Sequence, residues 1–504
     1  MCWYFYDKIK IHMVYLLSLT SLKKTESNFS KEENLKGCEQ KMYFIDECKI
    51  NSFLEDKSLN DEHFQVEILD KAREAKGLSL RESAALLNIS SPEVLDKLFQ
   101  KAKEVKEIIY GNRLVLFAPL YFSNLCVNNC LYCAFRKDNH KLQRKYLTLD
   151  EIEEEARILV QQGQKRILLV AGEHPKMAAL NFIGEAINRI YKINYSGNNI
   201  RRLNVNVAPL CVEDFRTLKS FGIGTYQCFH ETYHYETYKK MHPDGPKTDY
   251  GWRLYAMDRA LQAGIDDVGI GALFGLTNYK FETLGLLSHA FDLDSKYGVG
   301  PHTISVPRLE PALNAPAAIN PPHAVDDLSF KKIVAVIRLA VPYTGIILST
   351  RERAELRREL FSVGVSQISA GSRTAPGSYK ESRESMDEHS LEQFQLGDHR
   401  SLDEVVRDCT IQGYLPSFCT ACYRSNRTGD RFMELAKSAN IGKICLPNAM
   451  ATFKEYLNDF ASEETKVTAN KFFQDELNGL EETIKKKTSR MIEQVDSGAR
   501  DVYL

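Results

Sequence analysis

Eight short apolar runs recur between Gly111 and Thr374, and segments with helical periodicity separate them. The runs are LVLFAPLYF, RILLVAGE, RRLNVNVAP, GTYQCFHETY, DDVGIGALFGL, HTISVPR, YTGIILSTRE and VSQISAGSRT. Apolar and polar residues do not alternate strictly within them, which is typical of parallel strands buried on both faces. Eight strand–helix units predict an α/β protein with a closed, TIM-type (β/α)8 barrel. A doubly wound open sheet is the alternative architecture.

The segments before and after these runs have a helical pattern. Ser79 and Glu82 form a capping-box signature ahead of an apolar run, and Gly111 ends the helix that precedes the first strand. We therefore expect a helical region over 42–110, the barrel over 111–375 and a mostly helical domain over 376–504. The last domain should end in a long charged helix. Cys409 lies in an apolar helical stretch and is expected in the core.

The charge balance and the first residues restrict partners and location. Lys and Arg total 66 against 67 Asp and Glu, so the net charge of −1 gives no attraction to nucleic acid or to an anionic membrane. The apolar run 13–19 is too short to span a bilayer. We interpret residues 1–41 as an unstructured extension, with a targeting segment as the alternative. A cytoplasmic protein is expected, or one of an anaerobic organelle if the extension is a targeting signal.

Half of the twelve cysteines fall into two groups of three, a distribution unlike that of an extracellular disulfide framework. The first group, Cys126, Cys130 and Cys133, follows the first expected strand, and loops after barrel strands form the catalytic face. Structural zinc takes four ligands, so this CX3CX2C spacing is poorly suited to it. Thiolates hold iron–sulfur clusters, and a 4Fe-4S cluster with only three cysteines leaves one iron open for a substrate or cofactor.

The second group, Cys419, Cys422 and Cys445, has the spacing CX2CX22C and again lacks a fourth thiol in register. Three arginines stand close to it in the sequence: Arg424, Arg427 and Arg431. They could offset the negative charge of a thiolate-bound cluster or form a solvated basic surface. We expect a second iron–sulfur cluster here.

CVNNCLYC resembles the cluster motif of the radical S-adenosylmethionine (SAM) superfamily. The resemblance implies that the open iron binds the amino and carboxylate groups of SAM, which an electron then cleaves to methionine and a 5′-deoxyadenosyl radical. Tyr132 matches the aromatic position near the adenine. Gly172 and Glu173 resemble the superfamily's GGE stretch, which contacts the SAM amino group, although Ala171 replaces the first glycine. A helix cap is the alternative role of Glu173.

Further stretches resemble the radical SAM tyrosine lyases that help to mature FeFe-hydrogenase. They include GVGPHTISVPR, RLAVPYTG and PSFCTACYR, and the likeness runs from about Met42 to the end of the chain. It implies cleavage of L-tyrosine to p-cresol and dehydroglycine, and conversion of dehydroglycine to CO and cyanide at the second cluster. The product would be an Fe(CO)(CN) precursor of the hydrogenase active site. The implied partners are L-tyrosine, SAM, a reduced donor such as ferredoxin or flavodoxin, and other hydrogenase maturation proteins.

Three residues are candidates for contact with the substrate or SAM. Arg351 ends the seventh strand, where a guanidinium suits a tyrosine or SAM carboxylate; a salt bridge at the barrel rim is the alternative. Ser369, in the eighth strand, is a second candidate for the same group. Glu231, at the end of the fourth strand, is expected to touch the SAM ribose or the substrate amine. Its neighbour His230 stands where relatives usually have glutamine.

His302 opens the sixth strand and should therefore lie at the opposite end of the barrel, where the second cluster could dock. A lone histidine is usually structural, but the resemblance implies that one histidine holds an extra, labile iron on the second cluster. His302 is the first candidate, and His289 and His323 are the others. A route through the barrel for the small fragment remains a hypothesis, because such barrels are normally filled by side chains.

Two other functions are compatible with parts of the chain. The 2-iminoacetate synthases of thiamine thiazole biosynthesis cleave tyrosine on the same kind of barrel, but they do not need the second cysteine group. A non-catalytic scaffold that carries iron–sulfur clusters or zinc to a partner would need no SAM cleavage. Product analysis distinguishes the first alternative from the tyrosine lyase that makes CO. A 5′-deoxyadenosine assay distinguishes the second alternative from both enzymes.

Overall fold

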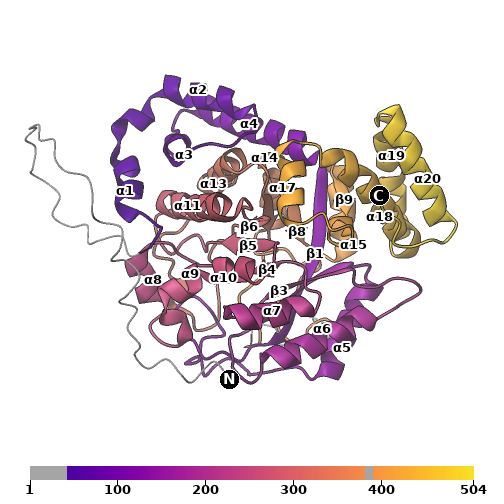
Figure 1. Ribbon diagram of the computed structural model, residues 1–504, viewed down its shortest axis with the longest axis horizontal. Coiled ribbons are helices and arrows are strands. Elements are labelled where there is room, and N and C mark those ends of the chain that lie inside the picture. Colours follow the sequence, from indigo (N-terminus) through magenta and orange to yellow (C-terminus); the bar gives the residue numbers. More distant parts are fainter. Residues whose placement is uncertain (1–42, 381–389) are drawn as a thin grey trace, which may run out of the picture. The chain divides into compact units, whose positions relative to one another are not determined.

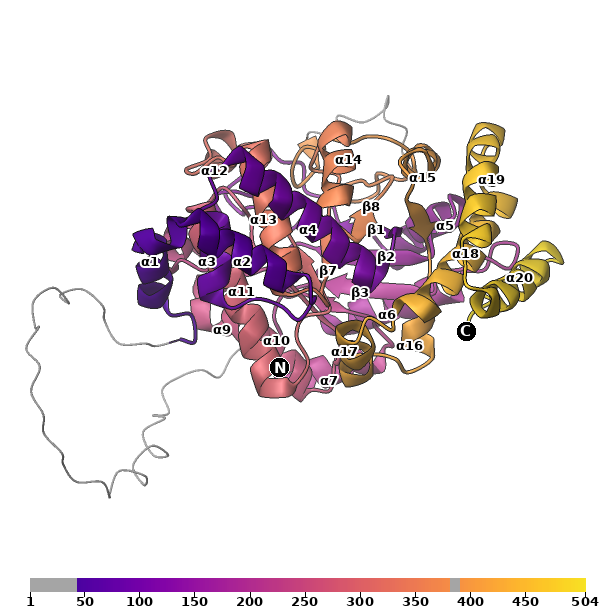
Figure 2. The same cartoon turned by 90° about the horizontal axis from the view of Figure 1, so that it is seen from above.

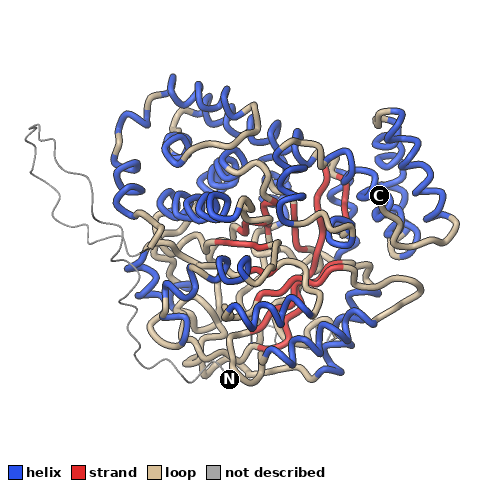
Figure 3. The backbone as a smooth tube through the Cα atoms, viewed as in Figure 1, coloured by secondary structure: helices blue, strands red, loops and turns tan. Residues whose placement is uncertain are grey.

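A computed structural model describes residues 43–380 and 390–504 of the chain, and residues 41–504 form one compact unit. The extension expected over 1–41 lies outside the described residues. Nine parallel strands form the central sheet, and helices surround it (Figures 1 and 3). The strands are β1 (Arg113–Ser123), β2 (Arg166–Ala171), β3 (Arg202–Asn206), β4 (Tyr226–Gln227), β5 (Val268–Gly271), β6 (Thr303–Ser305), β7 (Gly345–Leu348), β8 (Gln367–Ser369) and β9 (Leu415–Ser417).

The first eight strands close into a barrel, which confirms the predicted fold and excludes the open sheet. Their order is β2 to β8 followed by β1, and β1 also pairs with β2. β1 is long enough to serve three neighbours: Ala118–Ser123 pairs with β2, and Val115–Phe117 pairs with β8. The beginning of β1 pairs with β9, where Arg113 lies opposite Leu415. β9 therefore brings the C-terminal region to the lower end of the barrel, where the strands begin.

The helices agree with the sequence pattern except at two places. Gly479, Leu480 and Glu481 separate α19 from α20, so the long charged helix is in fact two helices. Tyr255 separates α9 from α10 within GWRLYAMDRALQAGI, a stretch whose pattern is that of one continuous helix. Between β-strands lie α5 (Leu149–Gln161), α6 (Leu180–Lys192), α7 (Val212–Ser220), α8 (Tyr235–Met241), α9 (Tyr250–Leu254), α10 (Ala256–Gln262), α11 (Tyr279–Tyr297), α12 (Pro316–Ile319), α13 (Asp327–Ala340) and α14 (Ala354–Val363).

The N-terminal helices cover one side of the barrel. They are α1 (Glu47–Glu55), α2 (Glu62–Ala72), α3 (Leu80–Leu87) and α4 (Pro92–Tyr110), with a 3-10 turn at Lys57–Asn60. Ser79 and Glu82 form the predicted capping box of α3, and Gly111 ends α4 with a φ of 63°. α4 packs against α13 and α14, and α3 against α11 and α13 (Figure 2). These contacts cover the outer apolar face of three barrel helices.

The C-terminal helices follow the barrel, and two of them, α15 and α18, pack against β9. They are α15 (Leu402–Ile411), α16 (Ala421–Arg424), α17 (Gly429–Lys437), α18 (Gly442–Asp459), α19 (Glu463–Asn478) and α20 (Glu482–Asp496). Cys409 is fully buried in α15, as predicted. None of the described helices combines the length and apolar character that crossing a membrane requires. The predicted boundaries at 110/111 and 375/376 stay a prediction.

Candidate active site and second cysteine site

The first cysteine group lines a cavity of about 190 Å³ at the upper end of the barrel, where the strands end. We call it the upper cavity. Every residue that the sequence predicted to bind the first cluster, SAM or the substrate lines this cavity. These residues come from five different strand–loop units. They are Cys126, Cys130, Cys133, Tyr132, Gly172, Glu173, Glu231, Arg351 and Ser369. The convergence follows from the barrel, which collects the ends of all its strands on one face.

The three thiols are suited to a cluster once their protons leave. Burial raises the pKa of Cys126 and Cys133 to about 11 and that of Cys130 to about 12. Two amides point N–H groups at the sulfurs: Asn128 Nδ2 lies 3.8 Å from Cys126 Sγ, and Gln393 Nε2 lies 3.5 Å from Cys133 Sγ. Such donors stabilise thiolates that bind a metal. The donor set therefore fits an iron–sulfur cluster.

A site for a single metal ion is a separate question from a site for a cluster. Across residues 43–380 and 390–504, no three His, Cys, Asp or Glu side chains are grouped closely enough to hold one metal ion.

Gly172 is required by close packing of two loops. A Cβ at this position would meet the carbonyl oxygen of Leu125 at 2.4 Å and the Cβ of Cys126 at 3.2 Å. The neighbouring Glu173 is fixed by Arg253 Nη1 at 2.7 Å and by Asn128 Nδ2 at 2.6 Å. Burial alone would raise the pKa of Glu173, but Arg253 and Lys247 outweigh it, so the pKa is lowered. Glu173 is thus an ionised acceptor at the cavity wall, and it does not cap a helix.

Glu231 has an unusual backbone as well as a cationic partner. Its φ is 75°, and its carbonyl accepts a hydrogen bond from Leu273 N at 2.7 Å. A non-glycine residue held in this region signals local strain, which is frequent at functional sites. Lys247 Nζ donates to Glu231 Oε1 at 2.7 Å. β4 is only two residues long, so Glu231 lies in the loop after it rather than at the strand end that was predicted.

Tyr132 is held at both its ring and its hydroxyl. The hydroxyl lies 2.8 Å from His242 Nε2, and His242 Nδ1 lies 2.8 Å from the carbonyl oxygen of Tyr238. Because that carbonyl can only accept, His242 carries its proton on Nδ1 and accepts from Tyr132. Lys247 Nζ lies 5.4 Å from the centre of the Tyr132 ring. His230 is buried beside this group, stacked on Tyr238 with ring centres 4.8 Å apart, and it does not line the cavity.

Arg351 lies in the loop after β7 rather than at the end of that strand; it is partly buried, and its guanidinium lies 3.2 Å from the centre of the Phe394 ring. Within the described part of the chain its guanidinium pairs with no carboxylate, and its one hydrogen bond goes to the carbonyl of Arg308 at 3.4 Å. A salt bridge at the barrel rim was the alternative role of Arg351. The structure shows that Arg308 makes this salt bridge instead, with Glu352 and Asp327. Ser369 Oγ accepts from Thr350 N at 3.1 Å. Arg351 is left with donors for an anionic group in the cavity.

The second cysteine group lines a cavity of about 50 Å³ at the lower end of the barrel, with His302 on its wall. We call it the lower cavity. Cys419 follows β9, Cys422 lies in α16 and Cys445 lies in α18. Cys422 and Cys445 share a hydrogen bond that lowers the pKa of Cys422 and raises that of Cys445. The three thiols thus converge from one strand end and two helices.

His302 is oriented by a carboxylate. Asp267 Oδ1 lies 3.4 Å from His302 Nδ1, and Asp267 Oδ2 accepts from Arg202 Nη2 at 3.0 Å. His302 Nε2 lies 3.2 Å from the hydroxyl of Tyr423, the residue after Cys422. Burial lowers the pKa of His302, which keeps the ring neutral and able to accept or ligate at Nε2. A carboxylate behind a histidine is a common arrangement at metal sites.

The other two candidate histidines lie elsewhere in the structure. His289 is buried in α11, where its Nδ1 lies 2.9 Å from the hydroxyl of Tyr233. His323 donates its backbone N–H to Gly275 O at 3.0 Å. Neither residue lines the lower cavity.

Two buried arginines from barrel strands face the lower cavity. They are Arg113 at the start of β1 and Arg166 at the start of β2. Arg113 has a raised pKa because Cys445 and Cys419 outweigh the effect of its burial. The Nε atoms of both arginines are buried without a hydrogen-bond partner among the described residues. These unsatisfied donors fit a negatively charged, thiolate-bound group.

Sequence reasoning missed the polar residues that support both sites. At the upper cavity these are Asn128, Lys247, Arg253 and Gln393, and at the lower cavity Arg113, Arg166 and Asp267. Asn128 stands inside the CVNNC motif and could have been singled out. The others follow no strand end and gave no local signal. Arg424, Arg427 and Arg431 do not line the lower cavity.

Comparison with known proteins agrees with this geometry. Residues 120–287 match the radical SAM superfamily, and residues 305–415 match the biotin and thiamin synthesis associated domain. The barrel with a three-cysteine loop after its first strand is thus that of a radical SAM enzyme, which implies a 4Fe-4S cluster, SAM and a reductant.

Two solved structures named HydG are similar to this chain over most of its length. One HydG, a maturase of the [FeFe]-hydrogenase, is 49% identical, with a TM-score of 0.88, covering 92% of this chain and all of the other. HydG from Carboxydothermus hydrogenoformans is 44% identical, with a TM-score of 0.77, covering 88% of this chain and 97% of the other. The 2-iminoacetate synthase of Escherichia coli (strain K12) is 31% identical over 349 residues, which are 69% of this chain and 89% of the synthase. The chain belongs to the HydG family.

Proposed function

We propose that this protein is a radical SAM tyrosine lyase that makes CO and cyanide for assembly of the FeFe-hydrogenase active site. The observation that carries the proposal is the pair of cysteine-lined cavities at opposite ends of one barrel. Tyrosine would be cleaved to p-cresol and dehydroglycine in the upper cavity. Dehydroglycine would then be converted at the lower cavity, which supplies the Fe(CO)(CN) precursor.

In the upper cavity, Cys126, Cys130 and Cys133 would hold the 4Fe-4S cluster, which supplies the electron that cleaves SAM. Glu173, kept ionised by Arg253, presents acceptor oxygens for the SAM amino group. Tyr132, fixed by His242, offers a ring face for the adenine. These residues bind and orient, and the surrounding barrel wall excludes water from the reactive radical.

The substrate carboxylate has a matching cation in the upper cavity. Arg351 is partly buried and pairs with no described carboxylate, so the carboxylate of a bound tyrosine would supply the missing anion and accept two charge-assisted hydrogen bonds. Ser369 lies on the same wall and offers a hydroxyl. Glu231, already paired with Lys247, is an acceptor for the substrate amine or the SAM ribose. Together these groups would hold the amino acid by its carboxylate and its amino group.

In the lower cavity, Cys419, Cys422 and Cys445 would hold an auxiliary 4Fe-4S cluster, and His302 would hold its extra labile iron. Asp267 fixes His302 so that Nε2 faces the cavity, and Arg113 and Arg166 offset the thiolate charge. Other hydrogenase maturation proteins would receive the product, and ferredoxin or flavodoxin would supply electrons.

Product analysis tests the proposal. Anaerobically reconstituted protein with SAM, dithionite and tyrosine should form 5′-deoxyadenosine, p-cresol and CO. The 31% identity to 2-iminoacetate synthase supports one other function, in which p-cresol forms and CO does not. The absence of 5′-deoxyadenosine would contradict both functions.

A further inference from the structure

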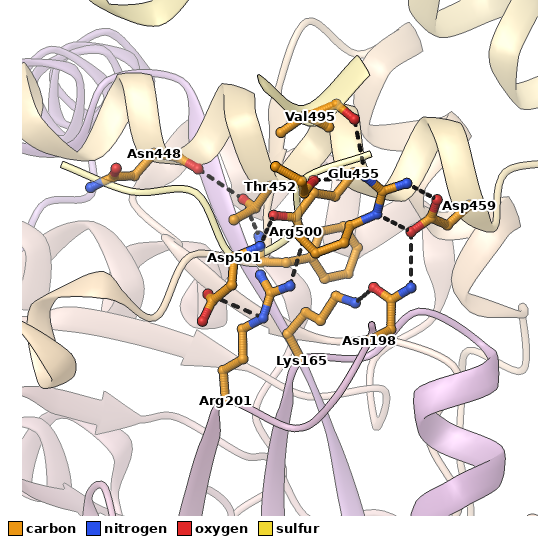
Figure 4. Close-up of polar contacts among 12 residues, drawn as sticks. Lys165, Asn198, Arg201, Asn448, Thr452, Glu455, Asp459, Val495, Arg500 and Asp501 are labelled. Carbon is orange, nitrogen blue, oxygen red and sulfur yellow. Dashed lines mark hydrogen bonds and ion pairs between the residues drawn. The ribbon is translucent and has the colours of Figure 1, made fainter. Parts of the chain in front are cut away.

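The last residues of the chain, Arg500–Leu504, run along α18, the helix that carries Cys445 (Figure 4). Arg500 Nε donates to Asp459 at 2.6 Å, and the backbone N–H of Asp501 donates to Glu455 Oε1 at 2.7 Å. Near the other end of the segment, Leu504 N donates to the Asn448 side chain at 2.8 Å. Three acceptors spaced along one helix therefore fix the direction of this segment.

The same segment also holds the loop that follows Cys422. Arg424 forms an ion pair with Asp501, and its guanidinium lies 4.3 Å from the centre of the Tyr503 ring. Arg427 Nη2 donates to the backbone oxygen of Leu504 at 2.6 Å. Cys422 and Cys445 are separated by 22 intervening residues, and residues 500–504 contact the chain beyond each of them. The segment thus connects the two arms that carry these thiols.

A third contact reaches the barrel. Asp501 Oδ1 lies 3.2 Å from Arg201 Nε, and Arg201 immediately precedes β3. Arg201 also pairs with Glu455 at 2.7 Å, and the two side chains are only 1% and 0% exposed. A buried ion pair is sensitive to the loss of any group that completes it. Asp501 therefore contacts the barrel, the loop after Cys422 and α18 at the same time.

We propose that residues 500–504 form a latch that fixes the second cysteine group against the lower end of the barrel, with Asp501 as its positioning residue. The inference rests on the proposed function of that group. Asp501 adopts a φ of 65°, a conformation that aspartate tolerates better than most residues, and this turn aims its carboxylate at both arginines. The latch would hold the three thiols in place before and after the cluster binds.

The test compares Asp501→Ala with Asp501→Glu in the full, anaerobically reconstituted chain. Asp501→Ala should raise amide hydrogen exchange of residues 418–431 about tenfold, alter the EPR signal of the second cluster and lower CO formation about fivefold or more. Formation of p-cresol should stay within about twofold of wild type, which also shows that the protein is folded. Asp501→Glu should recover most of the CO. Lys466→Ala, which removes an exposed ion pair with Glu463 on α19, is the matched control and should change nothing.

The latch is contradicted if Asp501→Ala leaves exchange and the EPR signal unchanged, or if p-cresol falls as much as CO. Absence of CO from the wild-type protein would instead contradict the proposed function. Hydrogen exchange of residues 418–431 in the metal-free chain would still test the latch, because it requires no turnover.

Discussion

The two cavities of this barrel differ in how their charges are balanced. In the upper cavity each buried carboxylate has its own cation: Glu173 pairs with Arg253, and Glu231 pairs with Lys247. In the lower cavity no carboxylate among the described lining residues pairs with Arg113 or Arg166; both face three thiols, and their Nε groups have no hydrogen-bond partner among the described residues. The upper cavity is therefore prepared for zwitterions such as SAM and tyrosine. The lower cavity is prepared for a resident anionic group.

Removing the first cysteine group should have the largest effect. Cys130→Ala should lower SAM cleavage, p-cresol and CO together by about 10³-fold or more, because the upper cavity supplies the fragment that the lower cavity uses. Anaerobic assay of the three products measures the loss. Cys409→Ala is the matched control, because Cys409 is buried but lines neither cavity. Retention of CO by Cys130→Ala would mean that the two cavities are not coupled in this order.

Removing the second cysteine group should abolish the reaction at the lower cavity and leave the reaction at the upper cavity largely intact. The double variant Cys419→Ala, Cys422→Ala should keep p-cresol formation within about threefold of wild type and lose the infrared bands of iron-bound carbonyl. The reason is that its thiols lie at the opposite end of the barrel from Arg351 and Glu231. Equal loss of p-cresol and CO would show that the cavities do not act separately.

Arg351→Gln should weaken tyrosine binding without touching either cluster. Loss of a charge-assisted contact to a carboxylate corresponds to about a 10- to 150-fold rise in the KM for tyrosine. The neighbouring Arg353 is exposed and pairs with Asp327, so Arg353→Gln is the matched control. A KM that changes for SAM instead of tyrosine would move Arg351 to the SAM carboxylate.

A smaller effect should appear in the pH dependence of stability beneath the upper cavity. Glu282 accepts hydrogen bonds from Thr232 Oγ1 and Tyr233 N, both at 2.7 Å, yet burial outweighs them and raises its pKa from 4.5 to about 8. The folded state therefore binds the proton of Glu282 more tightly than the unfolded chain does. The resulting contribution to the free energy of unfolding is complete below about pH 4.5 and declines as the pH rises to about 8.

Glu282→Gln, which mimics the neutral acid, should remove that decline. Wild type should lose about 4 kcal/mol more than the variant between pH 5 and pH 8.5. Thermal unfolding of both proteins across this range measures the difference. Parallel pH profiles would show that Glu282 is ionised throughout.

The sequence predicted which residues would meet at the upper cavity, because strand ends in a barrel share one face. Once eight apolar runs were recognised, residues that follow them, such as Cys126, Glu173 and Arg351, had to meet. Lys247 and Arg253 could not be found this way. They lie around the short helix α9 in the long connection between β4 and β5, and their direction depends on how that connection folds.

The lower site could be predicted only in part. The strand pattern placed His302 at the lower end, but nothing in the sequence showed that β9 would pair with β1 and bring Cys419 there. That pairing joins Arg113 to Leu415, about 300 residues apart, and no local pattern specifies it. The contacts of residues 500–504 are of the same kind, because they depend on side chains just before β3, in and just after α16, and in α18, which meet only after folding.

Iron counting with EPR, on protein reconstituted without oxygen, tests the claim of two separate cluster sites most directly. A variant with alanine at Cys126, Cys130 and Cys133 and another with alanine at Cys419, Cys422 and Cys445 should each keep about half of the wild-type iron. Their two spectra should differ from each other and together reproduce that of wild type. If both variants lost the same signal, or if wild type bound no more iron than either one, a single shared site would replace the two described here.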